Sequence, residues 1–131
     1  MSELFKYFMS KRRLSAVFAA AWTLLIFIGC TLPGSDLPPV HVFEHFDKVV
    51  HFSFFLVFQV LWVAAVGRRW IWVCVFLAMG YGFYLEFYQA HYVKGRSFDV
   101  WDGVADSFGA FVATVWIQHQ QCKKNVNSKT S

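Results

Sequence analysis

The chain has 131 residues, of which 57% are hydrophobic and only 15% are charged. A soluble domain of this size could not bury so much apolar surface, so the composition excludes an ordinary soluble protein and predicts one that lies in a membrane. The formal net charge of +4 does not indicate nucleic-acid binding, because most of the basic residues flank long apolar runs, and no nucleic-acid partner is expected.

Four apolar runs follow one another along the chain. They comprise residues 14–32, residues 52–66 with a polar entry from Asp47, residues 70–89 and residues 100–117. Each run approaches the roughly 20 residues that a helix needs to cross a bilayer, and none alternates as a barrel strand does. The sequence therefore predicts an all-α, polytopic membrane protein built as a bundle of four transmembrane helices.

The distribution of charge predicts the orientation, because Lys and Arg in short loops stay in the cytoplasm. Nine basic residues and one acid flank one set of helix ends, whereas three basic residues and seven acids lie at the other, giving net charges of +8 and −4. Both termini and the Arg68-Arg69 turn are therefore expected in the cytoplasm.

This topology predicts three parts. Residues 1–13 form a basic cytoplasmic N-terminus, residues 14–119 form the membrane domain, and residues 120–131 form a polar cytoplasmic tail that is expected to be disordered. Residues 14–32 are longer than the apolar region of a usual signal peptide and lack an Ala-x-Ala site, so we expect them to stay in the protein.

Several ionisable residues stand inside the predicted helices. Glu86 lies in the third run, and Asp102 and Asp106 lie in the fourth. A carboxylate in hydrocarbon costs several kcal/mol, which makes each of these residues a candidate for function. At about 1.5 Å of rise per residue, they and His51 lie in one layer, roughly 4 to 10 Å below the extracytoplasmic helix ends.

Helical spacing predicts which way these residues point. Glu86 continues a stripe of small residues on the third helix, and the two aspartates begin a similar stripe on the fourth. The stripes are Ala78, Gly82, Glu86 and Gln89, and Asp102, Asp106, Gly109 and Ala113. Small residues allow close helix packing and acids avoid lipid, so both faces are expected to turn inward. The result is a polar pocket that opens to the extracytoplasmic side.

Simpler structural roles exist for some of these residues. Asp47 suits the first turn of a helix, Lys48 can extend to the membrane interface, and Asp99 suits an N-cap. Arg96 can anchor lipid phosphate or pair with a buried acid, and we expect the pair because unpaired acids at this depth are unstable. A purely structural network rarely needs three acids, so Glu86, Asp102 and Asp106 remain functional candidates.

Metal and disulfide chemistry have weak support in the sequence. The pair His41-x-x-x-His45 has zinc spacing, but its surroundings are rich in proline and the Glu of a metalloprotease helix is missing. No metal site and no cofactor are expected. The three cysteines, Cys30, Cys74 and Cys122, fall at different depths of this topology, so none is expected to pair.

The ordered set of polar motifs resembles the VanZ-like family of bacterial membrane proteins. These motifs are Asp47-Lys48-x-x-His51-Phe52, Tyr81-Gly82, Glu86-x-x-Gln89, Gly95-Arg96 and Asp102-x-x-Ala105-Asp106-x-x-Gly109. The resemblance covers about residues 47–113. Asp106 is a departure, because many relatives have Asn at this position.

The resemblance implies a multi-pass protein of the bacterial cytoplasmic (inner) membrane. The family takes its name from a protein linked to resistance to the glycopeptide teicoplanin, and similar proteins occur with genes for envelope polysaccharides. Carried over by position, the signature residues are Asp47, Lys48, His51, Glu86, Gln89, Arg96, Asp102 and Asp106. We treat them as the candidate ligand-binding set.

Three classes of function remain open at this point. In the first, which we favour, the pocket binds an anionic lipid-linked or glycan ligand through Lys48, Lys94 and Arg96, in contact with membrane lipid and with envelope-polysaccharide machinery. In the second, the protein is an acid–base enzyme, with catalytic candidates Glu86, Asp102, Asp106 and His51. In the third, it is a small proton-coupled transporter, although no inverted repeat is visible.

Overall fold

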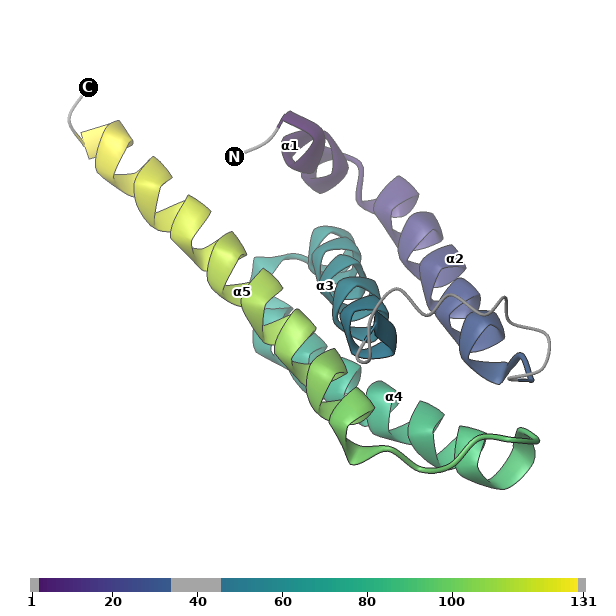
Figure 1. The fold of residues 1–131 in the computed structure, drawn as a ribbon. Helices are drawn as coiled ribbons and strands as arrows, with labels where there is room; N and C mark the ends of the chain where they lie inside the picture. Colours follow the sequence, from purple (N-terminus) through teal and green to yellow (C-terminus); the bar gives the residue numbers. More distant parts are fainter. Residues whose placement is uncertain (1–2, 34–45, 130–131) are drawn as a thin grey trace.

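The computed structural model describes residues 3–33 and 46–129, and within these ranges the chain is helical with no strand. Four long helices follow a short N-terminal one (Figure 1). Their bounds are α1 Glu3–Ser10, α2 Arg12–Thr31, α3 Phe46–Val66, α4 Ile71–Tyr92 and α5 Val100–Lys129, with a 3-10 turn, η2 Arg68–Trp70, between α3 and α4. The expectation of an all-α protein is confirmed.

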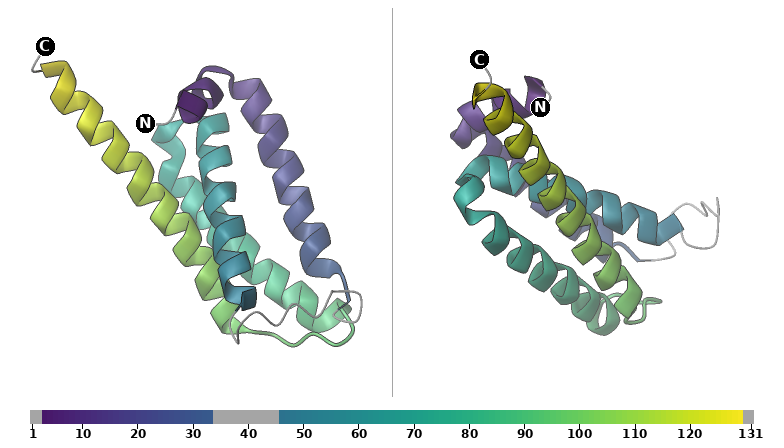
Figure 2. Two further views of the ribbon diagram at one scale, coloured as in Figure 1. Left: turned by 45° about the horizontal axis from the view of Figure 1, so that its top comes forward. Right: turned by 90° about the vertical axis from the view of Figure 1, so that its left-hand side faces the viewer.

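Helix α3 lies at the centre of the bundle. It packs most extensively along α5 and also along α2, while α4 packs along α5 (Figure 2). Helices α3 and α5 approach each other closely at Gly109, where a Cβ atom would overlap the carbonyl oxygen of Phe52. The small-residue stripe on the fourth run therefore does form a close helix–helix contact, as the sequence indicated.

The surface of the bundle is more apolar than that of a soluble protein, and its apolar core also holds buried polar residues. Large apolar residues are exposed on all four long helices, including Phe18, Val49, Phe76 and Phe108. Polar residues are buried between the helices, including Glu86 and Asp106, which are both 0% exposed. Exposed apolar surface, with the buried polar groups shielded between helices, matches a lipid environment.

Within the described residues, three helices are long and apolar enough to cross a membrane: Arg12–Thr31, Phe46–Val66 and the continuous Arg68–Tyr92 segment. Helix α5 does not belong to this set, because Asp102 and Asp106 stand in its first turns and its second part is polar. Its outward face is nevertheless apolar in the first half, where Trp101, Phe108 and Phe111 are exposed.

The predicted basic segments meet at one end of the bundle. Both chain ends and the α3–α4 turn lie at this end, and the α4–α5 connection lies at the other (Figure 2, left). Gly67 ends α3 with a positive φ of 100°, and the guanidinium of Arg12 lies beside it. Arg68 donates a hydrogen bond to Gln121 of α5. The basic segments that flank the apolar runs are thus gathered at one end of the bundle.

The prediction for the C-terminal tail is wrong for its described part. Helix α5 continues to Lys129 and extends past the other helices (Figure 1). The residues from 121 to 128 are exposed, so this extension is helical without burial. Gln and Lys are good helix formers and the preceding turns already provide a nucleus, which explains why the helix propagates.

Candidate functional site

The predicted polar residues do converge at the end of the bundle opposite the termini. Lys48 and His51 come from the start of α3, Glu86 from the end of α4, and Asp102 and Asp106 from the start of α5. All of them except Lys48 are buried, with His51 and Asp102 the most exposed at 6%. Three helices that are distant in sequence therefore place their ionisable groups in one layer, as the depth argument predicted.

Lys48 is the centre of the outer part of this layer. Its Nζ donates to Asp99 Oδ2 and to Asp102 Oδ1, both at 2.9 Å, and to Asp47 Oδ2 at 3.2 Å. These bonds join the first turn of α3 to the start of α5. All three protons of the ammonium group have an acceptor, so Lys48 acts as a bridge between carboxylates.

His51 and Asp106 form the inner part of the layer. His51 Nδ1 lies 3.0 Å from Asp106 Oδ1, and His51 Nε2 lies 4.0 Å from Asp102 Oδ2. Because a carboxylate accepts only, the short contact places a proton on Nδ1 when Asp106 is ionised. Asp106 is also pressed against α4: a Cβ at Gly82 would lie 2.7 Å from Asp106 Oδ2.

Glu86 is the least compensated acid. Its Oε2 accepts a hydrogen bond of 3.2 Å from the backbone amide of Asp99, and its Oε1 is buried without a partner among the described residues. The expected partner, Arg96, forms no ion pair with Glu86, Asp102 or Asp106 within the described part of the chain, so that prediction is wrong. Arg96 lies in the loop after α4, whereas Lys48 stands on α3, the helix that packs along α5.

Gln89 lies on the buried face of α4 but has a packing role. Its Nε2 donates to the carbonyl oxygen of Cys30 at 2.9 Å, which joins α4 to the end of α2. A second polar contact, deeper in the bundle, involves Gln59, whose Nε2 donates to Thr114 Oγ1 at 2.9 Å and to the carbonyl oxygen of Ile71 at 3.1 Å. Gln59 is not among the site residues predicted above, although a glutamine within an apolar run is itself a signal of a buried polar contact.

Asp99 has a larger role in the site than the N-cap role that the sequence suggests. It caps α5, because Trp101 N donates to Asp99 Oδ1 at 2.9 Å, and it also binds Lys48. The ammonium of Lys48, together with the Trp101 amide, holds the pKa of Asp99 below its ordinary value. Its spacing of three residues before Asp102 could have indicated a shared face.

A shallow groove lies beside Lys48 on the surface of α5. It has a volume of about 450 Å³ and is lined by Lys48, Trp101, Val104, Ala105 and Phe108. Trp101 is 69% exposed and Phe108 is also exposed, so the groove opens outward. The site therefore offers an aromatic and apolar wall next to a group of carboxylates.

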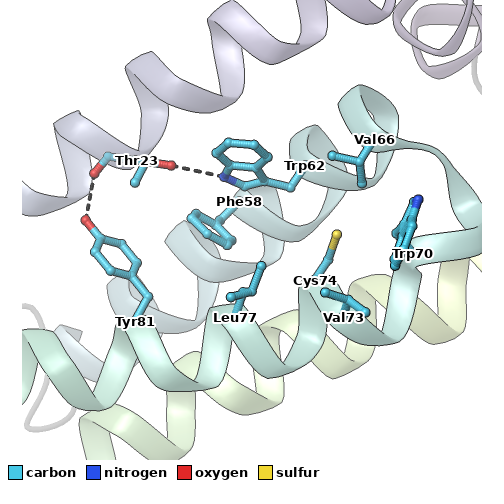
Figure 3. Close-up of a pocket in the computed structure, with 9 residues that line it drawn as sticks. All are labelled: Thr23, Phe58, Trp62, Val66, Trp70, Val73, Cys74, Leu77 and Tyr81. Atoms are coloured by element: carbon cyan, nitrogen blue, oxygen red, sulfur yellow. Dashed lines mark hydrogen bonds between the residues drawn. The ribbon is translucent and has the colours of Figure 1, made fainter.

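A second cavity, of about 510 Å³, lies nearer the other end between α2, α3 and α4 (Figure 3). Tyr81 donates from its hydroxyl to Thr23 O at 2.8 Å, and Trp62 Nε1 donates to Thr23 Oγ1 at 3.1 Å. The remaining lining residues are Phe58, Val66, Trp70, Val73, Cys74 and Leu77. No charged side chain lines this cavity, so its chemistry suits only an apolar occupant.

The remaining sequence predictions concern histidine and cysteine. Cys30, Cys74 and Cys122 are free, as expected. The pair His41 and His45 lies outside the described residues, so the structure does not test it.

Comparison with protein-family models, curated proteins and solved structures finds no match for this chain. Inferences about function therefore rest on the arrangement of the site itself.

Proposed function

We propose that this chain is a VanZ-like, four-span protein of the bacterial cytoplasmic membrane, with both termini in the cytoplasm and the polar site on the extracytoplasmic side. The gathering of basic residues at the end opposite the site supports this orientation. The exposed apolar face of α5, which includes Trp101, Val104, Phe108 and Phe111, supports its insertion as the fourth span. Its two acids face the interior, where the protein shields them from lipid.

We further propose that the site serves cell-envelope glycan biology by binding the sugar part of a lipid-linked glycan. The groove beside Lys48 carries this proposal, because it places Trp101 beside Lys48, whose Nζ is bonded to the carboxylates of Asp47, Asp99 and Asp102. Asp47 and Asp99 have side chains that are 55% and 37% exposed and can accept hydrogen bonds from sugar hydroxyls. The indole of Trp101 offers a flat apolar surface for a sugar ring, and Val104 and Phe108 continue it toward lipid.

The bonds of Lys48 favour a sugar over a phosphate at this point. Because three carboxylates already accept from its Nζ, an anion would have to displace one of them and would meet the remaining negative charges. Lys94 and Arg96, in the α4–α5 loop, form no ion pair with any described residue. We assign the phosphate of the lipid carrier to these two cations, which keeps part of the anionic recognition expected from the sequence.

A binding experiment with matched lipids tests the proposal. The full chain, purified in nanodiscs, is offered polyprenyl-diphosphate-linked N-acetylglucosamine or sugar-free polyprenyl diphosphate, and binding is measured by native mass spectrometry. We expect the sugar to improve affinity by roughly tenfold, equivalent to about 1.4 kcal/mol. Trp101→Ala should abolish the difference, whereas Phe111→Ala, which removes an exposed aromatic of α5 outside the groove, should retain it. Equal binding of both lipids by the wild type would refute the proposal.

An acid–base enzyme is the second candidate, and one observation favours it. Glu86 has a fully buried carboxylate with no basic partner within the described residues, and its Oε1 is free of hydrogen bonds there. Such a group is suited to exchange protons with a substrate. Glu86→Gln keeps the shape of the side chain and removes the charge. Normal abundance with a lost envelope phenotype, measured as polysaccharide output or teicoplanin sensitivity, would favour this candidate, and full activity would exclude it.

A further inference from the structure

We propose that the inner part of the polar layer is a binding site for one divalent transition-metal ion, Zn²⁺ or Mn²⁺, with His51, Glu86 and Asp102 as ligands. The site is independent of the glycan-binding proposal, because it uses the buried groups behind Lys48 and not the groove. Four features of the described residues support it.

The first feature is the position of the ligand atoms. One atom from each of His51, Glu86 and Asp102 lies within 4.8 Å of the other two, and all three residues are buried. Metal–ligand bonds to imidazole nitrogen and carboxylate oxygen are about 2.1 Å long, so neighbouring ligand atoms around one tetrahedral ion are about 3.4 Å apart. Small side-chain rotations would therefore bring the three atoms to bonding distance.

The second feature is the orientation of His51. Its Nδ1 lies 3.0 Å from Asp106 Oδ1, which fixes the proton on Nδ1 and leaves the lone pair on Nε2. Metal-bound histidines commonly donate their other N–H to a carboxylate in this way. Nε2 is also the nitrogen that faces Asp102 Oδ2, at 4.0 Å. Asp106 thus acts as a positioning residue for a histidine ligand.

The third feature is an unpartnered buried carboxylate. Glu86 is 0% exposed, and its Oε1 has no hydrogen-bond partner in the described part of the chain. A buried polar atom without a partner is costly, and a bound cation would remove that cost. The two carboxylate oxygens of Asp102 have different roles: Lys48 donates a hydrogen bond to Oδ1, and Oδ2 is left to bind the ion.

The fourth feature is the charge of the whole layer. Asp47, Glu86, Asp99, Asp102 and Asp106 supply five carboxylates, and among the described residues Lys48 and His51 are the basic groups that pair with four of them, all except Glu86. A neutral histidine leaves an excess of four negative charges, three of the acids being buried. A divalent cation would halve this excess in an environment where uncompensated charge is expensive.

A second group of acids beside this site does not offer a place for a metal ion. Asp47, Asp99 and Asp102 also bring their oxygens within 4.8 Å of one another. Lys48 Nζ already lies between them and bonds to each, so its ammonium takes the place that an ion would occupy. The choice of metal follows from the ligands: imidazole suits Zn²⁺, and two carboxylates also suit Mn²⁺.

Metal analysis of the purified full chain tests this inference. The protein is treated with chelator in detergent and dialysed against Zn²⁺ or Mn²⁺ at micromolar concentration, and bound metal is measured by mass spectrometry. We expect one ion per chain in the wild type, with a higher melting temperature in the presence of the bound metal. Asp106→Asn should weaken binding by roughly 10- to 100-fold, because it leaves the three ligands in place but removes the carboxylate that orients His51 and one negative charge of the layer.

Ligand and control variants complete the experiment. His51→Ala and Glu86→Gln should reduce bound metal to background, whereas His91→Ala, which removes an exposed histidine at the same end of α4, should bind like the wild type. If His51→Ala fails to fold by circular dichroism, Glu86→Gln decides, because it preserves the size of the side chain. Metal binding that is equal in the wild type and Glu86→Gln, or that needs millimolar metal, would overturn the inference.

Discussion

Lys48 has a different role in the structure from the role that the sequence suggests. In the sequence, it is a lysine near a helix end that suits the membrane interface or an anionic ligand. In the structure, its Nζ joins Asp47, Asp99 and Asp102 and thereby connects α3 to α5. Its side chain is 27% exposed, so solvent screens these ion pairs only in part.

Replacement of Lys48 should destabilise the fold. Lys48→Met keeps most of the side-chain volume but leaves Asp102 buried without its cation, which we expect to cost about 3 kcal/mol. Thermal unfolding in detergent would measure the loss, with Lys94→Met in the exposed loop as the control. The double variant Lys48→Met with Asp102→Asn should recover part of the stability. Equal melting temperatures for Lys48→Met and the wild type would contradict the role of Lys48.

Because Asp99 is paired with Lys48, its ionisation should make the stability of the fold depend on pH in the acid range. Because its folded pKa is lowered below the ordinary value near 3.9, the ionised form stabilises the fold above that value and loses this effect as pH falls through the folded pKa. We expect the wild type to melt above Asp99→Asn at pH values over about 5, with the difference shrinking at lower pH. Melting temperatures measured from neutral to acid pH test this, and a constant difference would contradict it.

At the scale of single helices, the small-residue stripes predict where helices come close together. Gly82 and Gly109 stand on the stripes identified in the sequence, and both are sites of close approach. At Gly82 the neighbour is the Asp106 carboxylate, so the glycine that permits helix packing also admits a site residue. Gly80, two residues away on the same helix, faces open space.

These two environments predict opposite results for the same substitution. Gly109→Ala would force a Cβ onto the backbone of α3 and should destabilise by about 1 to 3 kcal/mol, because backbone cannot move aside easily. Gly80→Ala has nothing within 4 Å of the new Cβ and should be neutral or stabilising by up to about 1 kcal/mol. Unfolding in detergent compares the two, and a stable Gly109→Ala protein would disprove the close α3–α5 contact.

At the scale of the whole molecule, basic, apolar and acidic residues lie in separate zones along the bundle. One end holds the termini and the Arg68-Arg69 turn, and the other holds the carboxylates with Lys48 and His51. Between them, the exposed side chains are largely apolar and the buried set includes Gln59 and Thr114. A bilayer accounts for all three zones at once, because it accepts apolar surface at its centre and charge at its faces.

This separation predicts the result of a topology experiment. Reporter fusions after Val66 and after Gln118 should report the cytoplasm, because these sites adjoin the basic end. A fusion at Lys94 should report the extracytoplasmic side, because that loop adjoins the carboxylate layer. Paired reporters, one active in each compartment, provide the internal control. A cytoplasmic signal from Lys94 would invert the orientation and move the polar site to the other compartment.

The sequence alone determined the helical class, the ends of the apolar runs and the inward direction of Glu86, Asp102 and Asp106. These properties depend on local periodicity and on the cost of charge in hydrocarbon, both of which are visible in a linear chain. The cap formed by Asp99 is local in the same sense, because donor and acceptor are two residues apart.

Only the tertiary structure decided which groups pair. From the sequence, Arg96 is the expected partner of the buried acids and Lys48 suits the membrane interface, but the packing of α3 along α5 brings Lys48, more than 50 positions from Asp99 and Asp102, into contact with both. The same packing places His51 against Asp106 and leaves Glu86 without a cation. The local sequence pattern predicts which face of its helix a residue occupies. The angle and register at which two helices pack decide which residues lie opposite it.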